Sequence, residues 1–452
     1  MTKSRNNASK ATPETTTTSN NQPVLGWTKP SAGCDFGFIK TAAANDDQQP
    51  INDAGEGHLI TIAPTGAGKG RSAIIPTLLS YQGPVMVIDP KGENYQVTAR
   101  RRQEMGQQVY KLDPFEMTGD DGDSLNLLDT FDSDASDNYD QAMALAELIM
   151  PGRSLQDPFW DDSARLLLAT LILHVASARP PVLRNLGEVA YLINQSTEDI
   201  QFDIKEMRKS KLEQVRRMAA GFTATEPKVW ASILSTAKAA TSLLNGNNFN
   251  AMSSHTSIPL EGIVRGDPIS IYLILPPEKL DSHGRFLRLW IGCLMNQICK
   301  RRHRVPQPTL FILDEAAQLG TLKQLRRAIT LLRGYGLRTW SFWQDLSQLQ
   351  MLYPDWKTLY NNCRYVQTFG CTTAMLSASI SEMLHLSNDI YPLHLERDEM
   401  ILAEAGRDAR VVIKPDYLKD HQYQGLYDAN PFHQPSPDHS QQQQPGLDRE
   451  AA

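Results

Sequence analysis

The sequence predicts an α/β protein with a doubly wound, mostly parallel β-sheet and an all-helical insertion domain. Short apolar runs, most of them rich in β-branched or aromatic residues, alternate with helical patterns, as expected of strands buried on both faces of a parallel sheet. These runs are Leu59–Ala63, Val85–Ile88, Gln108–Leu112, Ile269–Leu275, Leu310–Leu313, Arg338–Trp343 and Tyr365–Phe369. Residues 157–260 interrupt the alternation with helical patterns alone. A sheet covered by helices, with a helical insertion, is the simplest architecture that accounts for both observations.

Composition limits the classes of protein that remain. The chain has 452 residues, enough for two or three domains, and a net charge of −6. Any contact with nucleic acid must therefore come from local basic patches. The five cysteines have no metal-binding spacing, which indicates reduced thiols of a cytosolic protein. No apolar run approaches the ~20 residues that cross a membrane, so the sequence predicts a soluble protein.

The first strand runs into a glycine-rich loop, LITIAPTGAGKGRS, at residues 59–72. This is close to the phosphate-binding pattern G-x-x-x-x-G-K-[ST], which lies between a buried strand and a helix. Gly66 and Gly68 allow backbone N–H groups to point inward and hold an anion, and Lys69 follows at the position that reaches the β- and γ-phosphates. The predicted nucleotide-binding residues are Pro64, Thr65, Gly66, Ala67, Gly68, Lys69, Gly70 and Arg71.

The loop departs from the general pattern at two positions. Ala63 replaces the first glycine, and Gly70 stands where a Ser or Thr hydroxyl normally ligates Mg²⁺. Ser72 lies two residues further, about 200° around a helix, and is a poor substitute. Mg²⁺ therefore needs a carboxylate from elsewhere in the chain. The alternative is a glycine-rich turn that binds no ligand.

An acidic pair ends a later apolar strand in TLFILDEAAQLG, residues 309–320. Asp314 is suited to hold Mg²⁺, directly or through water, and Glu315 can act as the general base toward the attacking water. The competing interpretation is a helix N-cap with favourable charge placement. Gln344 ends the next strand, where its amide can sense the γ-phosphate or position the water, unless it is only a polar strand end.

One segment of the predicted insertion is basic. KEMRKSKLEQVRRM, residues 205–218, carries six Lys or Arg against two Glu. Such a surface can contact phosphates with an affinity that depends on salt but not on base sequence. We select Lys209, Lys211, Arg216 and Arg217 as candidate nucleic-acid-binding residues. A solvated helix surface explains the same composition equally well.

Several blocks of the sequence, in this order, resemble the type IV secretion coupling proteins, which are TraG-type conjugation ATPases of the FtsK-HerA group. The resemblance covers about residues 55–432 and includes the helical insertion. The blocks are APTGAGKG, VIDPKGENY, KLDPF, DPFWDDSARLLL, SILSTAKAATSLL, LILPPEKL, FILDEAAQLG, GYGLR and WQDLSQL. Glycine at position 70 is common in such proteins, so this departure from the general loop pattern is not a departure from the family.

The resemblance implies a RecA-like motor that uses ATP and Mg²⁺, assembles as a hexameric ring and passes DNA or protein substrates to a secretion channel. The implied partners are DNA, or a relaxase–DNA complex, and the components of the channel. Typical members have two membrane helices before the motor, whereas this sequence has a polar N-terminal tail. We therefore expect a cytoplasmic protein that is attached at the inner membrane, if at all, through a partner.

Ring motors of this kind need a cation from the neighbouring subunit to neutralise charge on the transferring phosphoryl group. The segment LLRGYGLRTW offers Arg333 and Arg338. Arg333 is the first choice, because it precedes a flexible Gly-Tyr-Gly and matches the position of such an arginine in related motors. Arg338, which opens a strand, is the second. An arginine near a turn can also be merely solvated.

The sequence thus predicts a Mg-dependent ATPase that moves DNA toward a type IV secretion or conjugation channel. The alternatives are a coupling receptor for protein effectors and a docking platform that binds nucleotide without hydrolysis. Residues 1–22 are rich in Ser, Thr and Asn and should be disordered. The predicted segments are a disordered tail over 1–50, the nucleotide-binding motor domain over 51–156 and 261–433, the helical insertion over 157–260 and a disordered Gln-rich tail over 434–452.

Overall fold

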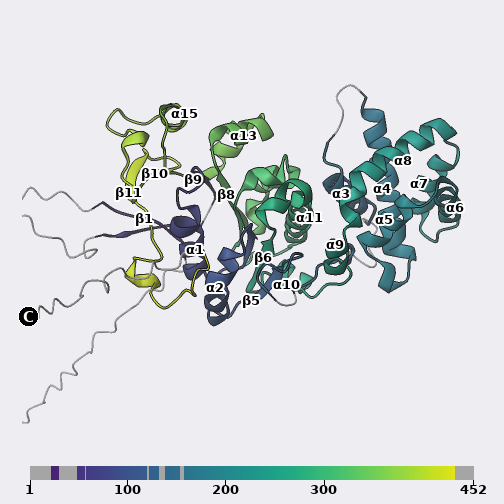
Figure 1. Cartoon of the computed structure of the whole chain (residues 1–452), viewed down its shortest axis with the longest axis horizontal. Helices are drawn as coiled ribbons and strands as arrows, with labels where there is room; N and C mark the ends of the chain where they lie inside the picture. Colours follow the sequence, from purple (N-terminus) through teal and green to yellow (C-terminus); the bar gives the residue numbers. More distant parts are fainter. Residues whose placement is uncertain are drawn as a thin grey trace, which may run out of the picture.

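The computed structural model describes residues 22–29, 48–55, 57–119, 122–131, 138–152 and 157–432. Among these residues, eleven strands form a single sheet in the order β2-β1-β11-β10-β9-β3-β8-β7-β4-β6-β5. The sheet occupies one side of the molecule in Figure 1, and a group of helices forms a separate lobe on the other side.

The predicted strands are confirmed, and all of them lie in one parallel block. They are β3 (His58–Ile62), β4 (Val85–Asp89), β5 (Gln108–Leu112), β6 (Ile269–Ile274), β7 (Thr309–Leu313), β8 (Leu337–Trp343) and β9 (Cys363–Thr368). The register of the pairs from β9 to β5 is parallel throughout. Most of these strands are buried along their whole length, which explains why their sequences are continuously apolar.

Helices cover both faces of the parallel block, so the fold is doubly wound. Ile60 and Ile62 of β3 share a core with α11 (Leu280–Cys299) and α12 (Lys323–Leu331), whereas Leu59 packs in a second core with α1 (Ile75–Ser80). Alternate residues of a strand point to opposite faces, so each strand contributes to both cores. The other helices of this part are α2 (Glu93–Glu104), α10 (Leu260–Arg265), α13 (Leu346–Leu352), α14 (Trp356–Asn361) and α15 (Ala374–Leu384).

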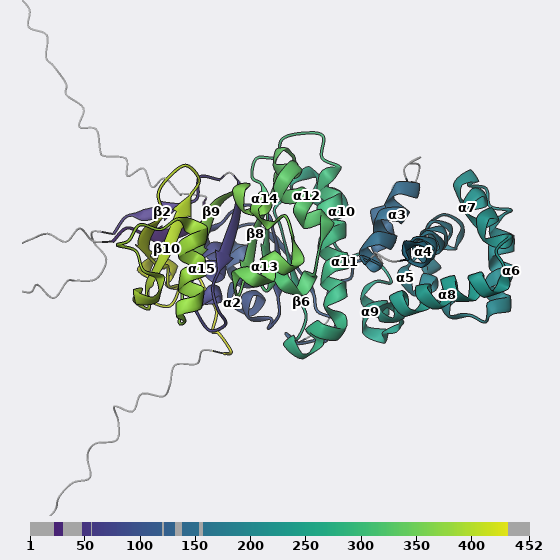
Figure 2. The same ribbon diagram turned by 90° about the horizontal axis from the view of Figure 1, so that it is seen from above.

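The chain between β5 and β6 forms the helical lobe. Residues 157–260, which the structure describes completely, contain helices and no strand, in agreement with the predicted pattern. The lobe consists of α4 (Pro158–Ala178), α5 (Leu186–Asn194), α6 (Thr197–Met207), α7 (Glu213–Thr223), α8 (Pro227–Thr241) and α9 (Asn247–Met252). Helix α3 (Asn138–Ile149) packs against both α4 and α11, so helical structure already begins before residue 157. Figure 2 shows α6 and α7 at the end of the lobe that is farthest from the sheet.

Four strands at the β9 edge of the sheet were not predicted. They are β1 (Val24–Trp27), β2 (Pro50–Asn52), β10 (Glu399–Glu404) and β11 (Arg410–Ile413), and they pair antiparallel. Strands β1, β2 and β11 are only three or four residues long, whereas β10 contains an apolar run, residues 400–403, that sequence reasoning missed. The prediction of disorder over residues 1–50 is wrong at β1, because Val24 and Leu25 are buried. Residues 1–21 and the predicted Gln-rich tail, 434–452, lie outside the described residues.

In the described part of the chain, no helix combines the length and the apolar character needed to cross a bilayer.

Candidate nucleotide-binding site

The glycine-rich loop connects β3 to a π-helical turn, η1 (Gly70–Ile74), that continues into α1. Gly66 and Gly68 have φ angles of +79° and +94°, which side-chain-bearing residues rarely adopt. A Cβ atom added at Gly66 or Gly70 would meet no other atom within 4 Å. The loop therefore presents its backbone to open space at the start of a helix, which is the geometry of an anion site.

The loop borders a cavity of about 830 Å³. This volume lies within the range of about 300–1,000 Å³ that is usual for ligand sites. Of the predicted nucleotide-binding residues, Thr65 to Arg71 line the cavity, together with Asp314, Glu315 and Gln344. Pro64 lines an adjoining cavity instead. The structure thus brings together loop and acidic pair, which are about 250 residues apart in the sequence, because both follow the carboxyl ends of parallel strands.

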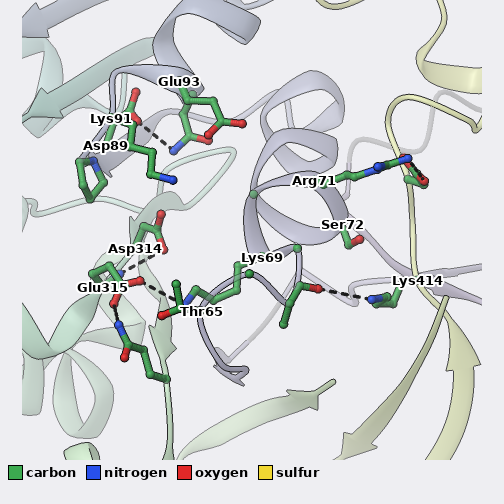
Figure 3. A pocket seen from close by; sticks show the side chains of 18 of the residues that line it. Thr65, Lys69, Arg71, Ser72, Asp89, Lys91, Glu93, Asp314, Glu315 and Lys414 are labelled. Atoms are coloured by element: carbon green, nitrogen blue, oxygen red, sulfur yellow. Dashed lines mark hydrogen bonds and ion pairs between the residues drawn. The ribbon is translucent and has the colours of Figure 1, made fainter. Parts of the chain in front are cut away.

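Three predicted side chains form a chain of contacts across the cavity (Figure 3). Lys69 Nζ donates a hydrogen bond to Glu315 Oε1 at 3.1 Å and another to Ala63 O at 3.3 Å. Gln344 Nε2 donates to Glu315 Oε2 at 2.8 Å. Both oxygens of one carboxylate are therefore engaged, one by the loop lysine and the other by the amide that ends β8.

Glu315 is held in an unusual backbone conformation. Its φ and ψ angles are +54° and +51°, in the left-handed region that costs a residue other than glycine of order 1–3 kcal/mol. The Glu315 N–H donates to Asp314 Oδ1 at 3.1 Å, which supports this conformation. The Glu315 side chain lies toward Lys69, as Figure 3 shows.

Two acidic side chains end neighbouring strands of the sheet. Asp314 follows β7, and burial together with the adjacent Glu315 carboxylate raises the pKa of Asp314 to about 7, although Lys69 acts in the opposite direction. Asp89 ends β4, and burial raises the pKa of Asp89 to about 7 despite hydrogen bonds from Tyr95 N and Asn94 Nδ2. Sequence reasoning missed Asp89. The available signal was the same as for Asp314, namely an aspartate that ends an apolar strand.

These carboxyl groups suit a magnesium ion that is bound together with phosphates. Burial raises both pKa values, and a nearby divalent cation would favour the charged carboxylates and so oppose that effect. In the described residues, no cluster of three or more His, Cys, Asp or Glu could hold a metal ion by itself. Mg²⁺ usually binds to one or two carboxylates, with phosphate oxygens and waters as its other ligands. The residues present therefore fit Mg²⁺ bound with a nucleotide and do not form an all-protein metal cage.

The C-terminal segment forms a wall of the cavity that sequence reasoning did not identify. Arg71 donates two hydrogen bonds to the Asp416 carboxylate, from Nε and Nη2, each 2.7 Å long. Lys414 Nζ donates to Ala67 O at 3.5 Å and lies 4.8 Å from the centre of the Phe369 ring. Arg397 and Lys419 line the cavity on the same side. These residues follow β11 or precede β10 in segments without a recognisable motif.

The two candidate arginines occupy different environments. Arg338 is 2% exposed, forms an ion pair with Asp53 (Nη1 to Oδ2, 2.6 Å) and donates from Nε to Gly57 O at 2.7 Å. A buried, paired arginine is a structural group and cannot reach another subunit. Arg333 is exposed in the short helical turn η7 (Leu332–Tyr335). Arg333 is therefore the remaining candidate for an arginine that acts on a neighbouring subunit.

The candidate nucleic-acid-binding residues lie on α7 and on the turn between α6 and α7, and not in the nucleotide cavity. Lys209 pairs with Glu206 (2.6 Å) and Arg217 with Glu213 (2.5 Å). Arg216 Nη1 donates to Ser210 O and Lys211 O, so this guanidinium also stabilises the turn. Lys211 is exposed. The positive charge of the segment is thus partly neutralised by its own two glutamates.

A phosphate-binding loop on a doubly wound sheet, with an acidic pair at a nearby strand end, defines a nucleotide-binding protein of the RecA-like class. The family model described as "Type IV secretory system Conjugative DNA transfer" matches residues 2–384, and the chain belongs to this family.

Two relatives are similar to about two thirds of the chain. The conjugal transfer protein TraG of Agrobacterium fabrum (strain C58 / ATCC 33970) is 28% identical over 306 residues, which cover 66% of this chain and 46% of TraG. Protein VirD4 of the same organism is 26% identical over 332 residues, covering 70% of this chain and 48% of VirD4. The chain therefore spans about half the length of these relatives.

Solved structures of a conjugative coupling protein share the fold. An unbound form of TrwBdeltaN70 matches with a TM-score of 0.61 and 16% identity, over 79% of this chain and 84% of that chain. The complex of TrwB with ADP and Mg²⁺ matches with a TM-score of 0.61 and 15% identity, over the same shares. At this identity the likeness shows the RecA-like fold alone.

Proposed function

We propose that the protein is an ATP-driven motor of the coupling-protein type, which recruits DNA or a relaxase–DNA complex and moves it toward a type IV secretion channel. The observation that carries the proposal is the contact chain from Lys69 through Glu315 to Gln344 across the loop cavity. Such a chain links a phosphate-binding cation, a carboxylate base and an amide, which are the groups that hydrolysis of a phosphoanhydride requires.

Each side chain has a defined part in this reaction. The backbone N–H groups of residues 66–70 and the Lys69 ammonium bind phosphate oxygens, and Arg71 is positioned at the loop by Asp416. Asp314, with Asp89 beside it, would hold Mg²⁺, which supplies positive charge to the phosphate oxygens when bound. Glu315 accepts the proton of the attacking water at its carboxylate. Gln344 fixes the orientation of that carboxylate through the bond at Oε2.

The arginine that completes the site comes from a second copy of the chain. Arg333 precedes β8, and Gln344 follows it, so the two residues lie at opposite ends of the same seven-residue strand. At about 3.3 Å per residue, this strand separates them by roughly 20 Å. Arg333 therefore serves a neighbouring subunit in a head-to-tail ring, and we propose a hexamer.

The proposed substrate is DNA, contacted through the helical lobe. The names of TraG and of the coupling protein TrwB connect the family to conjugation. The basic segment of α6 and α7 lies at the far end of the helical lobe (Figure 2). DNA contacts there would involve phosphates and not base edges. The ion pairs of Lys209 and Arg217 favour a second candidate, a receptor for protein effectors, because they reduce the charge available for DNA.

The experiment that tests the proposal is ATP hydrolysis measured with and without single-stranded and double-stranded DNA. A motor for DNA should hydrolyse ATP and be stimulated by DNA. If the protein assembles without DNA and hydrolyses ATP at a rate that DNA does not change, the receptor for protein effectors is favoured. If the protein binds nucleotide but hydrolyses none under any of these conditions, the docking platform is the only one of the three functions that remains. We also propose that partner proteins attach this protein at the inner membrane.

A further inference from the structure

A third acidic side chain lines the nucleotide cavity on the same side as Asp89 and Asp314. Glu93 is the first residue of α2, four positions after the aspartate that ends β4. Burial is the main cause of the raised pKa values of Asp89 and Asp314, and the negative charge of Glu93 adds to both. Figure 3 shows the three carboxylates on the side of the pocket opposite Lys414. Glu93 therefore belongs to the acidic side of the cavity.

Glu93 has a partner from a distant part of the chain. Asn430 Nδ2 donates a hydrogen bond to Glu93 Oε1 at 2.6 Å and another to the hydroxyl oxygen of Tyr417 at 2.9 Å, and Asn430 is only 6% exposed. A glutamate in the first turn of a helix also complements the helix dipole. That role does not require a buried amide on the carboxylate, whereas a side chain that must keep one orientation at a site does.

The donor amide belongs to the C-terminal segment, residues 414–432, which is anchored by contacts outside the cavity. Tyr417 and Tyr423 are buried in a small apolar core with residues of α1 and α2. Asp428 forms an ion pair with Arg100 of α2, with 2.7 Å between Oδ1 and Nε. These contacts hold the segment against α2 whether or not a ligand fills the cavity. The amide is therefore preorganised.

We propose that Glu93 is a third carboxylate of the magnesium site and that Asn430 is its positioning residue. The inference rests on the proposed function, because it concerns the metal ion that accompanies the nucleotide. Among the described residues, the acidic side chains do not form a cluster that could hold an ion by itself, so Glu93 acts through water and not as a direct ligand. Mg²⁺ usually keeps several of its waters. A carboxylate that accepts hydrogen bonds from those waters strengthens the binding of the ion.

Binding of a fluorescent, non-hydrolysable ATP analogue tests this role without relying on hydrolysis. Glu93→Gln keeps the size of the side chain and removes its charge. The Mg²⁺ concentration that gives half of the magnesium-dependent increase in binding should rise about tenfold, as is typical when a group that supports a metal site is lost. Binding in EDTA should not weaken, because the change removes negative charge near the phosphates. An unchanged magnesium titration, or equal weakening in magnesium and in EDTA, would overturn the inference.

Asn430→Ala tests the positioning role. This variant should raise the same Mg²⁺ concentration by a smaller factor than Glu93→Gln does. In the Glu93→Gln background it should add nothing, because both changes act through one carboxylate. Additive shifts in the double variant would show that Asn430 does not act through Glu93, and the positioning role would be wrong.

Asp428→Asn is the matched control. Asp428 lies in the same segment and pairs with Arg100, but it is not among the described residues that line the cavity. The magnesium titration of this variant should equal that of the unmodified protein. Equal shifts in Asp428→Asn and Asn430→Ala would mean that loosening of the segment causes the effect, which would overturn the assignment of Asn430.

ATP hydrolysis by the unmodified protein separates this inference from the proposed function. If Glu93→Gln shifts the magnesium titration but the unmodified protein never hydrolyses ATP, with or without DNA, the role of Glu93 stands and the motor proposal fails. If ATP is hydrolysed but magnesium does not change analogue binding, or Glu93→Gln leaves the titration unchanged, the motor proposal stands and the role of Glu93 is wrong.

Discussion

Lys69 Nζ lies 3.1 Å from Glu315 Oε1, and the second oxygen of the same carboxylate accepts a hydrogen bond from Gln344 Nε2 at 2.8 Å. One carboxylate thus connects the loop that would bind phosphate to the end of β8. A nucleotide phosphate must compete with Glu315 for Lys69. That competition would free one Glu315 oxygen to accept a proton when the phosphates are in place.

Changes at these two residues should separate binding from chemistry. Lys69→Ala removes the cation that contacts the phosphates, so both ATP binding and hydrolysis should be lost. Glu315→Gln keeps the size of the side chain but removes the base, so ATP binding should persist while hydrolysis falls about 10²–10⁴-fold. Binding is measured with a fluorescent nucleotide and hydrolysis by phosphate release.

Gln318→Ala is the control for these two variants, since Gln318 lines the same cavity and we assign it no part in the reaction. It should keep near-normal turnover. Unchanged hydrolysis in Glu315→Gln, with intact folding, would contradict the assignment of the base.

Asp314→Asn should weaken the response to magnesium. Loss of one carboxylate charge next to the phosphates should raise the Mg²⁺ concentration for half-maximal hydrolysis at least tenfold. Binding of ATP in the presence of EDTA should not weaken, because Asp314 would contact the metal and not the phosphates. If the magnesium dependence is the same as in the unmodified protein, Asp314 is not a metal-binding residue.

Arg333→Ala should leave ATP binding intact and abolish most of the turnover. Mixing this variant with Lys69→Ala should restore part of the activity, because some interfaces then combine an intact loop with an intact arginine. The measurement is hydrolysis as a function of the mixing ratio. Mixed oligomers that remain inactive at every ratio would show that Arg333 does not act across the interface.

Arg338→Ala should destabilise the fold. The change leaves Asp53 as a buried carboxylate without its partner, and breaking a buried ion pair in this way costs about 3–5 kcal/mol. The free energy of unfolding in urea, compared with that of Arg333→Ala, measures the difference. Equal stability of the two variants would mean that the Asp53 pair does not support the native state.

Charge reversal in the helical lobe tests the DNA contact. Lys209→Glu/Lys211→Glu should weaken binding to unrelated DNA sequences to a similar extent, and the salt dependence of binding should become less steep. Arg407→Glu/Arg410→Glu is the control, because it changes the net charge equally at exposed positions near the β10–β11 turn. Binding is measured by fluorescence anisotropy at several salt concentrations. Equal effects of the two pairs would show that net charge, and not this segment, governs binding.

The parallel half of the fold could be predicted from the sequence because its strands are buried on both faces. Burial of that kind produces continuous apolar runs, and the residue that ends such a run lies at the carboxyl edge of the sheet. Lys69, Asp314 and Gln344 could therefore be assigned to one edge before their contacts were known. The antiparallel strands β1, β2 and β11 are only three or four residues long, too short for a distinctive run, and the apolar residues 400–403 of β10 were not recognised as a strand.

The sequence by itself determined the phosphate-binding loop, the acidic pair and the parallel core, because each depends on local spacing or on a local apolar pattern. Tertiary structure alone decided between Arg333 and Arg338, which have similar local contexts. Asp53, far away in the chain, buries Arg338 in an ion pair and leaves Arg333 exposed at the turn. Contacts between distant segments likewise placed Asp416 against Arg71 at the wall of the nucleotide cavity. No local pattern encodes these relationships, because they depend on which segments the fold brings together.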